Sequence, residues 1–191
     1  MRASSLRGIL SLMPSTLASL ANSKIAITNG TVQGLPANGA GIKTFLGIPF
    51  AAPPIGSLRW QSPQPATAFS GIYNATAFGP SCYSADVEIP QGQGRPVMVW
   101  IYGGGFQFGS SNLPLYNGTN LAEQDVIVVT FNYRLRVFGF LGLAELDQQG
   151  TPSGDYGLQD QLTALRWVKE NIAAYGGDPD KFHVGVAECQ P

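Results

Sequence analysis

The sequence predicts an α/β sandwich, in which helices flank a mixed, mostly parallel sheet. Two continuous apolar runs rich in β-branched residues, 97–102 and 126–131, are typical of strands that are buried on both faces. Apolar residues then repeat at helical spacing over 158–174, and a further strand begins at 181–184. The order strand, loop, strand, helix, strand is that of an α/β protein.

The chain begins with shorter elements. Weak alternation over 25–32, with Asn29-Gly30 as the turn, predicts a hairpin. Residues 44–50 predict a short strand that is ended by Pro49. Both elements precede the main strands in the sequence.

A long irregular stretch follows. Four prolines make 51–65 an irregular surface loop, and 69–80 remains rich in turn residues. The polar segment 85–96, with glycines at 92 and 94, closes this first region.

Two helices are expected in the second half, a short one at 121–124 and a long one at 158–174. Asp155 stands near the N-cap of the long helix, Gly176-Gly177 end it, and Pro179 prevents its continuation. Along it, apolar residues recur at helical spacing: Leu158, Leu162, Leu165, Val168 and Ile172. Ala164 and Trp167 stand beside them, and Trp167 is interpreted as core.

The composition excludes several classes of protein. Charged residues make up 12% of the 191 residues and the net charge is −1, so there is no basic field for nucleic acid. Two cysteines, Cys82 and Cys189, are too few for a disulfide scaffold, and a single histidine argues against a metal site. We expect no transmembrane segment, because no later run is long and apolar enough to span a bilayer.

The N-terminus carries the features of a secretory signal peptide. Two arginines and a mildly apolar segment over 1–21 predict cleavage near Asn22 and a secreted protein, although a disordered tail is the alternative. Three sequons, at Asn29, Asn74 and Asn117, are candidate glycosylation sites and agree with secretion.

The apolar run 97–102 ends abruptly in Gly103-Gly104-Gly105-Phe106. Glycine amides carry no neighbouring Cβ, so their N–H groups can approach an anionic oxygen closely. Such a loop is either an oxyanion hole or simply a tight turn. A phosphate-binding loop is excluded because no lysine follows at the required spacing.

Seven short segments accompany this loop in a specific order and spacing: 45–51, 54–59, 100–106, 132–135, 137–141, 155–161 and 171–178. With them the chain resembles the type-B carboxylesterase and lipase family of the α/β-hydrolase fold, which includes the cholinesterases and fungal lipases. The resemblance extends over about 22–184 and covers the N-terminal third or so of a full family member.

The resemblance implies a carboxylic ester hydrolase of the serine esterase type. Such enzymes act on small ester or acylglycerol substrates and need no cofactor; no specific protein partner is implied. Gly104 and Gly105 match the glycines whose amides face the oxyanion, where one donor is worth about 3–4 kcal/mol. Gly103 and Phe106 are expected to shape the loop, with Phe106 lining the acyl pocket.

Three departures from the family pattern are visible. Glycine, glutamate and serine are expected at 186–188, but the chain has Val186, Ala187 and Glu188. The nucleophile elbow, the acid and the catalytic histidine are therefore absent from the 191 residues. We expect residues 22–191 to be a truncated and inactive domain, cut short by a defective gene model or an aberrant transcript.

The other departures concern Cys82 and Arg136. The family cysteine that pairs with the one matching Cys82, together with its own strand, is expected to be missing between Tyr83 and Pro96. Arg136 stands where the family usually has glycine, which would cost stability if the backbone there needs a positive φ.

Alternative readings remain for single residues and for the whole chain. His183 is interpreted as structural or superficial, and Cys189 as a poor nucleophile because no base accompanies it. Asp155, Asp160 and Arg134 are interpreted as ties between loops and sheet. The alternative function is that of a non-catalytic binding or adhesion member of the fold.

Overall fold

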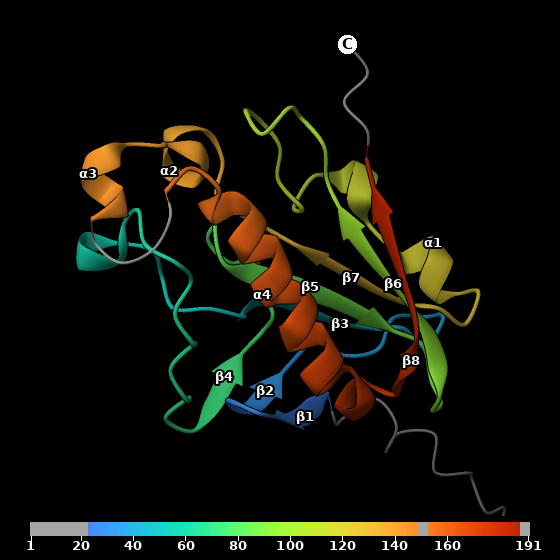
Figure 1. The fold of residues 1–191 in the computed structure, drawn as a ribbon. Coiled ribbons are helices and arrows are strands. Elements are labelled where there is room, and N and C mark those ends of the chain that lie inside the picture. The colour runs from blue at the N-terminus through green and yellow to red at the C-terminus, as the bar shows by residue number, and fades with distance from the viewer. Residues whose placement is uncertain (1–22, 149–152, 188–191) are drawn as a thin grey trace, which may run out of the picture.

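A computed structural model describes residues 23–148 and 153–187. The expected signal peptide, Glu188 and Cys189 lie outside these residues. The described chain forms a five-stranded sheet and a separate three-stranded sheet. The long helix α4, Tyr156–Asn171, crosses one face of the larger sheet (Figure 1).

The strands form two groups. The three-stranded sheet has the order β1-β2-β4 and the five-stranded sheet the order β3-β5-β7-β6-β8. Their bounds are β1 Lys24–Ile27, β2 Gly30–Gln33, β3 Lys43–Pro49, β4 Ile72–Asn74, β5 Ser84–Ile89, β6 Arg95–Ile101, β7 Ile127–Phe131 and β8 Gly177–Val186.

The helices other than α4 are short. They are α1 Thr119–Ala122, α2 Arg136–Phe140 and α3 Ala144–Asp147, with 3-10 turns η1 Gly56–Leu58, η2 Pro114–Tyr116 and η3 Ile172–Tyr175. The sequence did not predict four of the observed elements: the short helices α2 and α3, the 3-10 turn η2 and the strand β4. Helix α1 begins two residues before the expected 121–124.

The mixed sheet with flanking helices confirms the expected fold class. Strand β6 pairs parallel with both β7 and β8, while β5 pairs antiparallel with β3 and β7. The N-terminal hairpin is also confirmed, because β1 and β2 pair antiparallel with Ile27 opposite Gly30. The carboxyl ends of the three parallel strands meet at one edge of the sheet, where ligands bind in open α/β sheets.

The expectation that a strand is missing between Tyr83 and Pro96 is wrong. Residues Ser84–Ile89 form β5, which is buried along its whole length between β3 and β7. Its apolar residues alternate with polar ones, and the apolar set packs into the core. On the opposite face the Asp86 carboxylate accepts a hydrogen bond from the Gly47 amide at 2.7 Å.

Strand β6 is buried on one face only, contrary to the expectation of burial on both. Val97, Val99 and Ile101 are buried, whereas Met98 and Trp100 on the other face are half-buried. Strand β7, in contrast, is buried at every residue as expected.

The buried face of α4 differs from the apolar repeat. Leu158 and Leu162 are 42% and 54% exposed, so these two members of the apolar repeat lie outside the core, whereas Trp167 is buried as expected. The buried stripe starts at Tyr156, two residues before the expected start of the helix, and repeats at helical spacing through Asp160, Ala164, Trp167 and Val168. Asp160 is a charged residue in this stripe, and it hides the true period from a search for apolar residues.

The helix ends as the glycines indicate. After α4 and η3, Gly176 adopts a left-handed conformation with φ +90°, and its amide donates to the Ala173 carbonyl. This turn reverses the chain and leads directly into β8.

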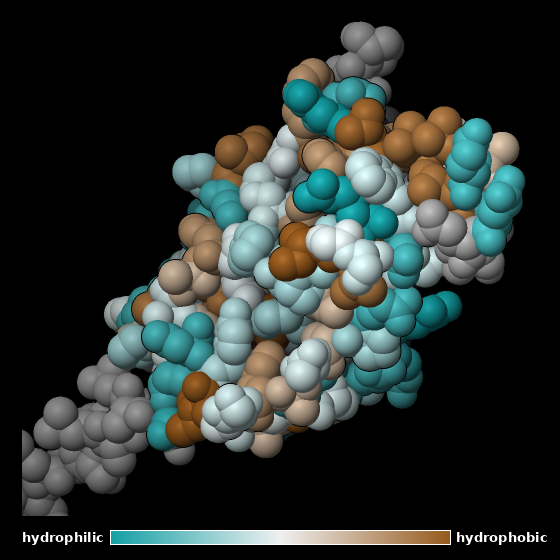
Figure 2. Space-filling model, turned by 90° about the vertical axis from the view of Figure 1, so that its left-hand side faces the viewer, coloured by the Kyte–Doolittle hydropathy of each residue, from teal (hydrophilic) through white to brown (hydrophobic). Residues whose placement is uncertain are grey.

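Apolar residues are scattered among polar ones on the side of the molecule that carries α3 and β4, with several gathered toward its upper end (Figure 2).

Candidate active site

The glycine loop begins where β6 ends at the carboxyl edge of the parallel strands. Ile101 is the last residue of β6, and the Ala187 amide after β8 donates to its carbonyl at 2.9 Å. The loop and the end of β8 are therefore fixed side by side. Strand β6 places Gly103–Phe106 where the sequence predicts them.

Gly104 cannot be replaced by another residue without disturbing the loop. Its φ of +127° lies in a region that residues with a side chain rarely adopt. A Cβ on Gly104 would also collide with the Phe108 carbonyl oxygen. The loop at Gly104 therefore presents backbone groups and no side chain.

The amides of Gly104 and Gly105 are available to a ligand. In the described part of the chain neither N–H donates a hydrogen bond to another residue. The Gly104 carbonyl, in contrast, accepts from the Gln107 and Phe108 amides at 3.0 and 3.2 Å. The loop closes through this carbonyl and leaves two adjacent donors unpaired, which is the requirement for binding an oxyanion.

A small cavity of about 160 Å³ adjoins these donors. Its walls come from the end of β6, the glycine loop, the segment after β7, helix α4 and the end of β8: Ile101, Tyr102, Gly103, Gly104, Gly105, Phe106, Tyr133, Gln161, Val186 and Ala187. The described lining contains no serine, histidine or carboxylate. This part of the site can stabilise negative charge but supplies no nucleophile.

Phe106 follows the three glycines and lines the cavity. Its ring is 44% exposed and packs against Phe140 of α2 with centroids 4.5 Å apart. Phe106 has φ +60°, so the loop continues in a left-handed conformation after Gly104 and Gly105.

Two tyrosines support the floor of the site. The Tyr102 and Tyr133 rings stack with centroids 4.6 Å apart, and the Tyr133 hydroxyl donates to the Tyr102 carbonyl at 2.8 Å. Burial raises the pKa of Tyr102 above its usual range, so its hydroxyl stays neutral and does not serve as a base. Sequence reasoning gave no role to Tyr133 or Gln161, although both lie in motifs that carry the family resemblance.

A buried ion pair holds the segment after β7 to helix α4. The Arg134 guanidinium donates to both Asp160 carboxylate oxygens, at 2.7 and 2.8 Å, and a further N–H of the guanidinium donates to the Gln61 carbonyl. Both side chains are almost fully buried. Arg134 and Asp160 thus tie three segments together, as expected, and their polar atoms are occupied by one another.

The remaining sequence candidates are not gathered at this site. His183 is an exposed residue of β8 opposite Met98 of β6. Among the described residues Cys82 forms no disulfide, and burial raises the pKa of its thiol, which disfavours the reactive thiolate. In 23–148 and 153–187 no three metal-ligating side chains come together in a way that could hold a metal ion.

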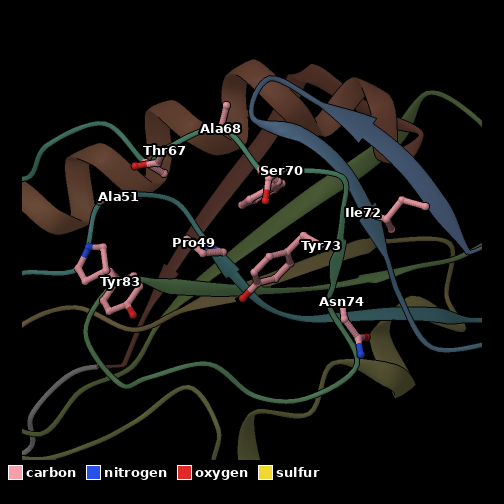
Figure 3. Close-up of a pocket in the computed structure, with 12 residues that line it drawn as sticks. Pro49, Ala51, Thr67, Ala68, Ser70, Ile72, Tyr73, Asn74 and Tyr83 are labelled. Carbon is pink, nitrogen blue, oxygen red and sulfur yellow. The ribbon is translucent and has the colours of Figure 1, made fainter.

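A larger and more open groove lies elsewhere, between β3, β4 and the loop before β4. It measures about 530 Å³ and is lined by proline, aromatic and small hydroxyl residues (Figure 3). Figure 3 shows Thr67, Ala68 and Ser70 along one stretch of loop, with the Tyr73 side chain below them. The Tyr73 hydroxyl donates to the Gly47 carbonyl at 2.8 Å, and burial raises its pKa. The lining therefore offers no activated nucleophile or base.

The mixed sheet, with helix α4 on one face and a glycine loop at the carboxyl end of its parallel strands, has the arrangement of the α/β-hydrolase class and superposes on solved esterases. The chain belongs to the carboxylesterase family, whose model matches residues 21–95 and 86–185. This confirms the family resemblance seen in the sequence.

Several relatives and solved structures are similar to this chain. It is 40% identical over 180 residues to the fumonisin B1 esterase of Sphingopyxis macrogoltabida and 42% identical over 194 residues to the cholinesterase of Mus musculus. These alignments cover 82% and 84% of the chain but 33% and 31% of the relatives. The chain thus spans about a third of their length.

The structural similarity has the same extent. A carboxylesterase of Geobacillus stearothermophilus superposes with a TM-score of 0.79 at 40% identity, and covers 86% of this chain and 38% of its own. A PNB esterase gives the same TM-score at 42% identity. Along the described residues, no helix has the length and apolar character needed to cross a membrane.

Proposed function

We propose that this chain carries the oxyanion-binding part of a carboxylic ester hydrolase, with the amides of Gly104 and Gly105 as the donors. The observation that carries the proposal is the pair of adjacent, unpaired N–H groups beside a cavity at the end of β6. The named relatives are esterases or a cholinesterase, which supports carboxylic esters as the substrate class, and acylglycerols are proposed from the family resemblance alone. The adhesion alternative gains no comparable support.

In the proposed reaction a serine attacks the ester carbonyl, and a histidine oriented by an acid removes the serine proton. The former carbonyl oxygen becomes negative, and the two glycine amides stabilise it. The 191 residues hold no Gly-x-Ser-x-Gly sequence, and their one histidine is the exposed His183. The polypeptide of these residues alone is therefore proposed to bind the anion without completing hydrolysis.

Amide NMR of the 191-residue polypeptide tests the proposed donors. Methylphosphonate, a tetrahedral anion, is titrated into ¹⁵N-labelled protein, and the amide protons of Gly104 and Gly105 are expected to move downfield together. Gly39 serves as the internal control, because it is exposed and has open space on its side-chain face. Shifts at Gly104 and Gly105 no larger than the shift at Gly39 would overturn the proposal.

The proposal includes glycosylation at two of the three sequons. Asn74 and Asn117 are exposed, and Asn117 precedes α1 in a loop. The Asn29 side chain is half-buried, and its amide donates to the Ala66 carbonyl at 2.9 Å. A glycan is compatible with the fold at Asn74 and Asn117, whereas at Asn29 it would replace this hydrogen bond.

A further inference from the structure

One residue outside the glycine loop holds two of its carbonyl groups. The backbone N–H of Arg136, the first residue of α2, donates to the Phe106 carbonyl at 2.8 Å. The side-chain Nε–H of Arg136 donates to the Gln107 carbonyl at 2.6 Å. Its guanidinium carbon lies 5.1 Å from the centre of the Phe108 ring. Arg136 thus contacts three consecutive residues of the loop.

These contacts are made from a strained backbone. Arg136 has φ +52°, in the left-handed region that favours glycine, and the resemblance implies glycine at this position. The positive φ considered from the sequence is therefore present. Strain of this kind persists where surrounding contacts hold it in place, and it is common at functional sites.

The hydrogen bonds of the loop form a relay from Arg136 to the oxyanion donors. A trans peptide unit holds its carbonyl and its N–H in one plane, pointing in opposite directions. In the peptide units 106–107 and 107–108, the carbonyl groups accept hydrogen bonds from Arg136. The N–H groups of the same two units both donate to the Gly104 carbonyl. That carbonyl shares a peptide unit with the Gly105 N–H, so fixing the carbonyl also fixes the direction of this donor.

The loop has few other supports on this side. Phe108 is 64% exposed, and the Phe106 ring has its partner in Phe140, which belongs to the same helix α2 as Arg136. Helix α2 is anchored in turn, because the Trp60 indole N–H donates to the Val137 carbonyl at 2.8 Å. Arg136 therefore connects the loop to a fixed element of the fold.

We propose that Arg136 is a positioning residue of the oxyanion hole, which orients the Gly105 amide through the peptide units of Phe106, Gln107 and Phe108. This inference rests on the proposed function of Gly104 and Gly105. It assigns a role to a residue of α2 at which the chain departs from the family glycine. Arg136 itself does not contact the cavity.

Two variants, of which only one removes the backbone strain, test this role. Arg136→Gly removes the strain and the Nε–H donor, whereas Arg136→Met keeps the Cβ and the aliphatic stem but removes the same donor. Both variants keep the backbone N–H. Arg166→Met, at an exposed site on α4, is the matched control. The readouts are the hydrogen-exchange protection of the Gln107 and Phe108 amides and the midpoint of thermal unfolding.

A positioning role predicts that protection of Gln107 and Phe108 falls in both variants by about fivefold, the worth of one hydrogen bond. The unfolding midpoint should be higher in Arg136→Gly than in Arg136→Met, by about 2–4 °C. Loop protection would then fall equally in the two variants although their unfolding midpoints differ. Methylphosphonate should bind about fivefold more weakly to both variants.

A purely stabilising role of Arg136 gives a different result. Loop protection would follow the unfolding midpoint, and Arg136→Gly would keep or gain protection, which would overturn the inference. The proposed function fails separately, if methylphosphonate leaves the Gly104 and Gly105 amides of the parent chain unmoved. The exchange measurement needs no anion and is unaffected by that outcome.

Discussion

Asp86 and Glu88 are acidic residues on a strand that is buried at every position. Burial raises the pKa of Asp86 to about 6 and that of Glu88 to about 7, from ordinary values of 3.8 and 4.5. The folded protein thus holds these protons more tightly than the unfolded chain does. Their contribution to stability is complete below the unfolded values and is lost as the pH rises through 6 and 7.

We therefore expect the free energy of unfolding to fall between pH 5 and pH 8. Glu88→Gln, which keeps the shape and removes the charge, should flatten this dependence and make the protein more stable at pH 8. Urea denaturation at pH 5, 6, 7 and 8 measures both effects. Glu123→Gln, at an exposed site, is the control, and an unchanged slope in Glu88→Gln would contradict the prediction.

The different exposure of the three sequon asparagines leads to a second prediction about single residues. Protein recovered from the medium of a glycosylating host should carry glycans at Asn74 and Asn117 but not at Asn29, because the Asn29 amide is engaged with the Ala66 carbonyl. Intact mass before and after deglycosylation gives the number of glycans. The variants Asn74→Gln and Asn117→Gln should each remove one, and a glycan that disappears in Asn29→Gln would count against this expectation.

Helix α4 shows how a charged residue in a core stripe misleads a search for apolar spacing. The apolar pattern places Leu158 and Leu162 inside, whereas the helix buries Tyr156 and Asp160. Asp160 occupies a core position because Arg134 neutralises it there. A pairing between distant segments cannot be seen in the local pattern of the helix.

The buried face of α4 can be tested by a pair of truncations. Val168→Ala removes two methyl groups from a fully buried position and should cost about 2 kcal/mol of unfolding free energy. Leu162→Ala, at a residue that is 54% exposed, should change it by less than about 0.5 kcal/mol. Equal losses in urea denaturation would show that Leu162 belongs to the core after all.

Strand β5 was missed for a related reason. Its alternation of Ser84, Asp86 and Glu88 with apolar residues is a period-two pattern, but its polar members are ones that usually face water. Here the Ser111 hydroxyl donates to the Asp86 carboxylate at 3.3 Å, and the Glu88 carboxylate lies beside the Gly118 backbone. Burial of the polar face depends on a loop that follows in sequence, so the strand itself gives no indication of it.

Across the whole molecule, the sequence predicts the parallel strands and the glycine loop correctly, because long apolar runs and glycine clusters have few alternative structures. The neighbours of the loop are harder to predict. Tyr133, Gln161 and Arg136 reach it from two other segments, and only the fold brings these together.

For the whole molecule, we expect the purified 191-residue polypeptide to show no ester hydrolysis that depends on a catalytic triad. Two amides can stabilise an oxyanion but cannot attack a carbonyl. Turnover of p-nitrophenyl acetate is measured against Gly104→Pro, which removes one donor. Faster turnover by the parent chain than by this variant would show that the residues present suffice for catalysis.

The position of β6 in the sheet has a consequence for the order in which the protein is made. Its two partners, β7 and β8, both follow it in the chain, and β8 begins at Gly177, after the whole of α4. During synthesis β6 therefore keeps one edge unpaired until β8 has left the ribosome. Such pairing between distant segments is slow, and the exposed edge leaves the nascent chain dependent on protection from aggregation during that interval.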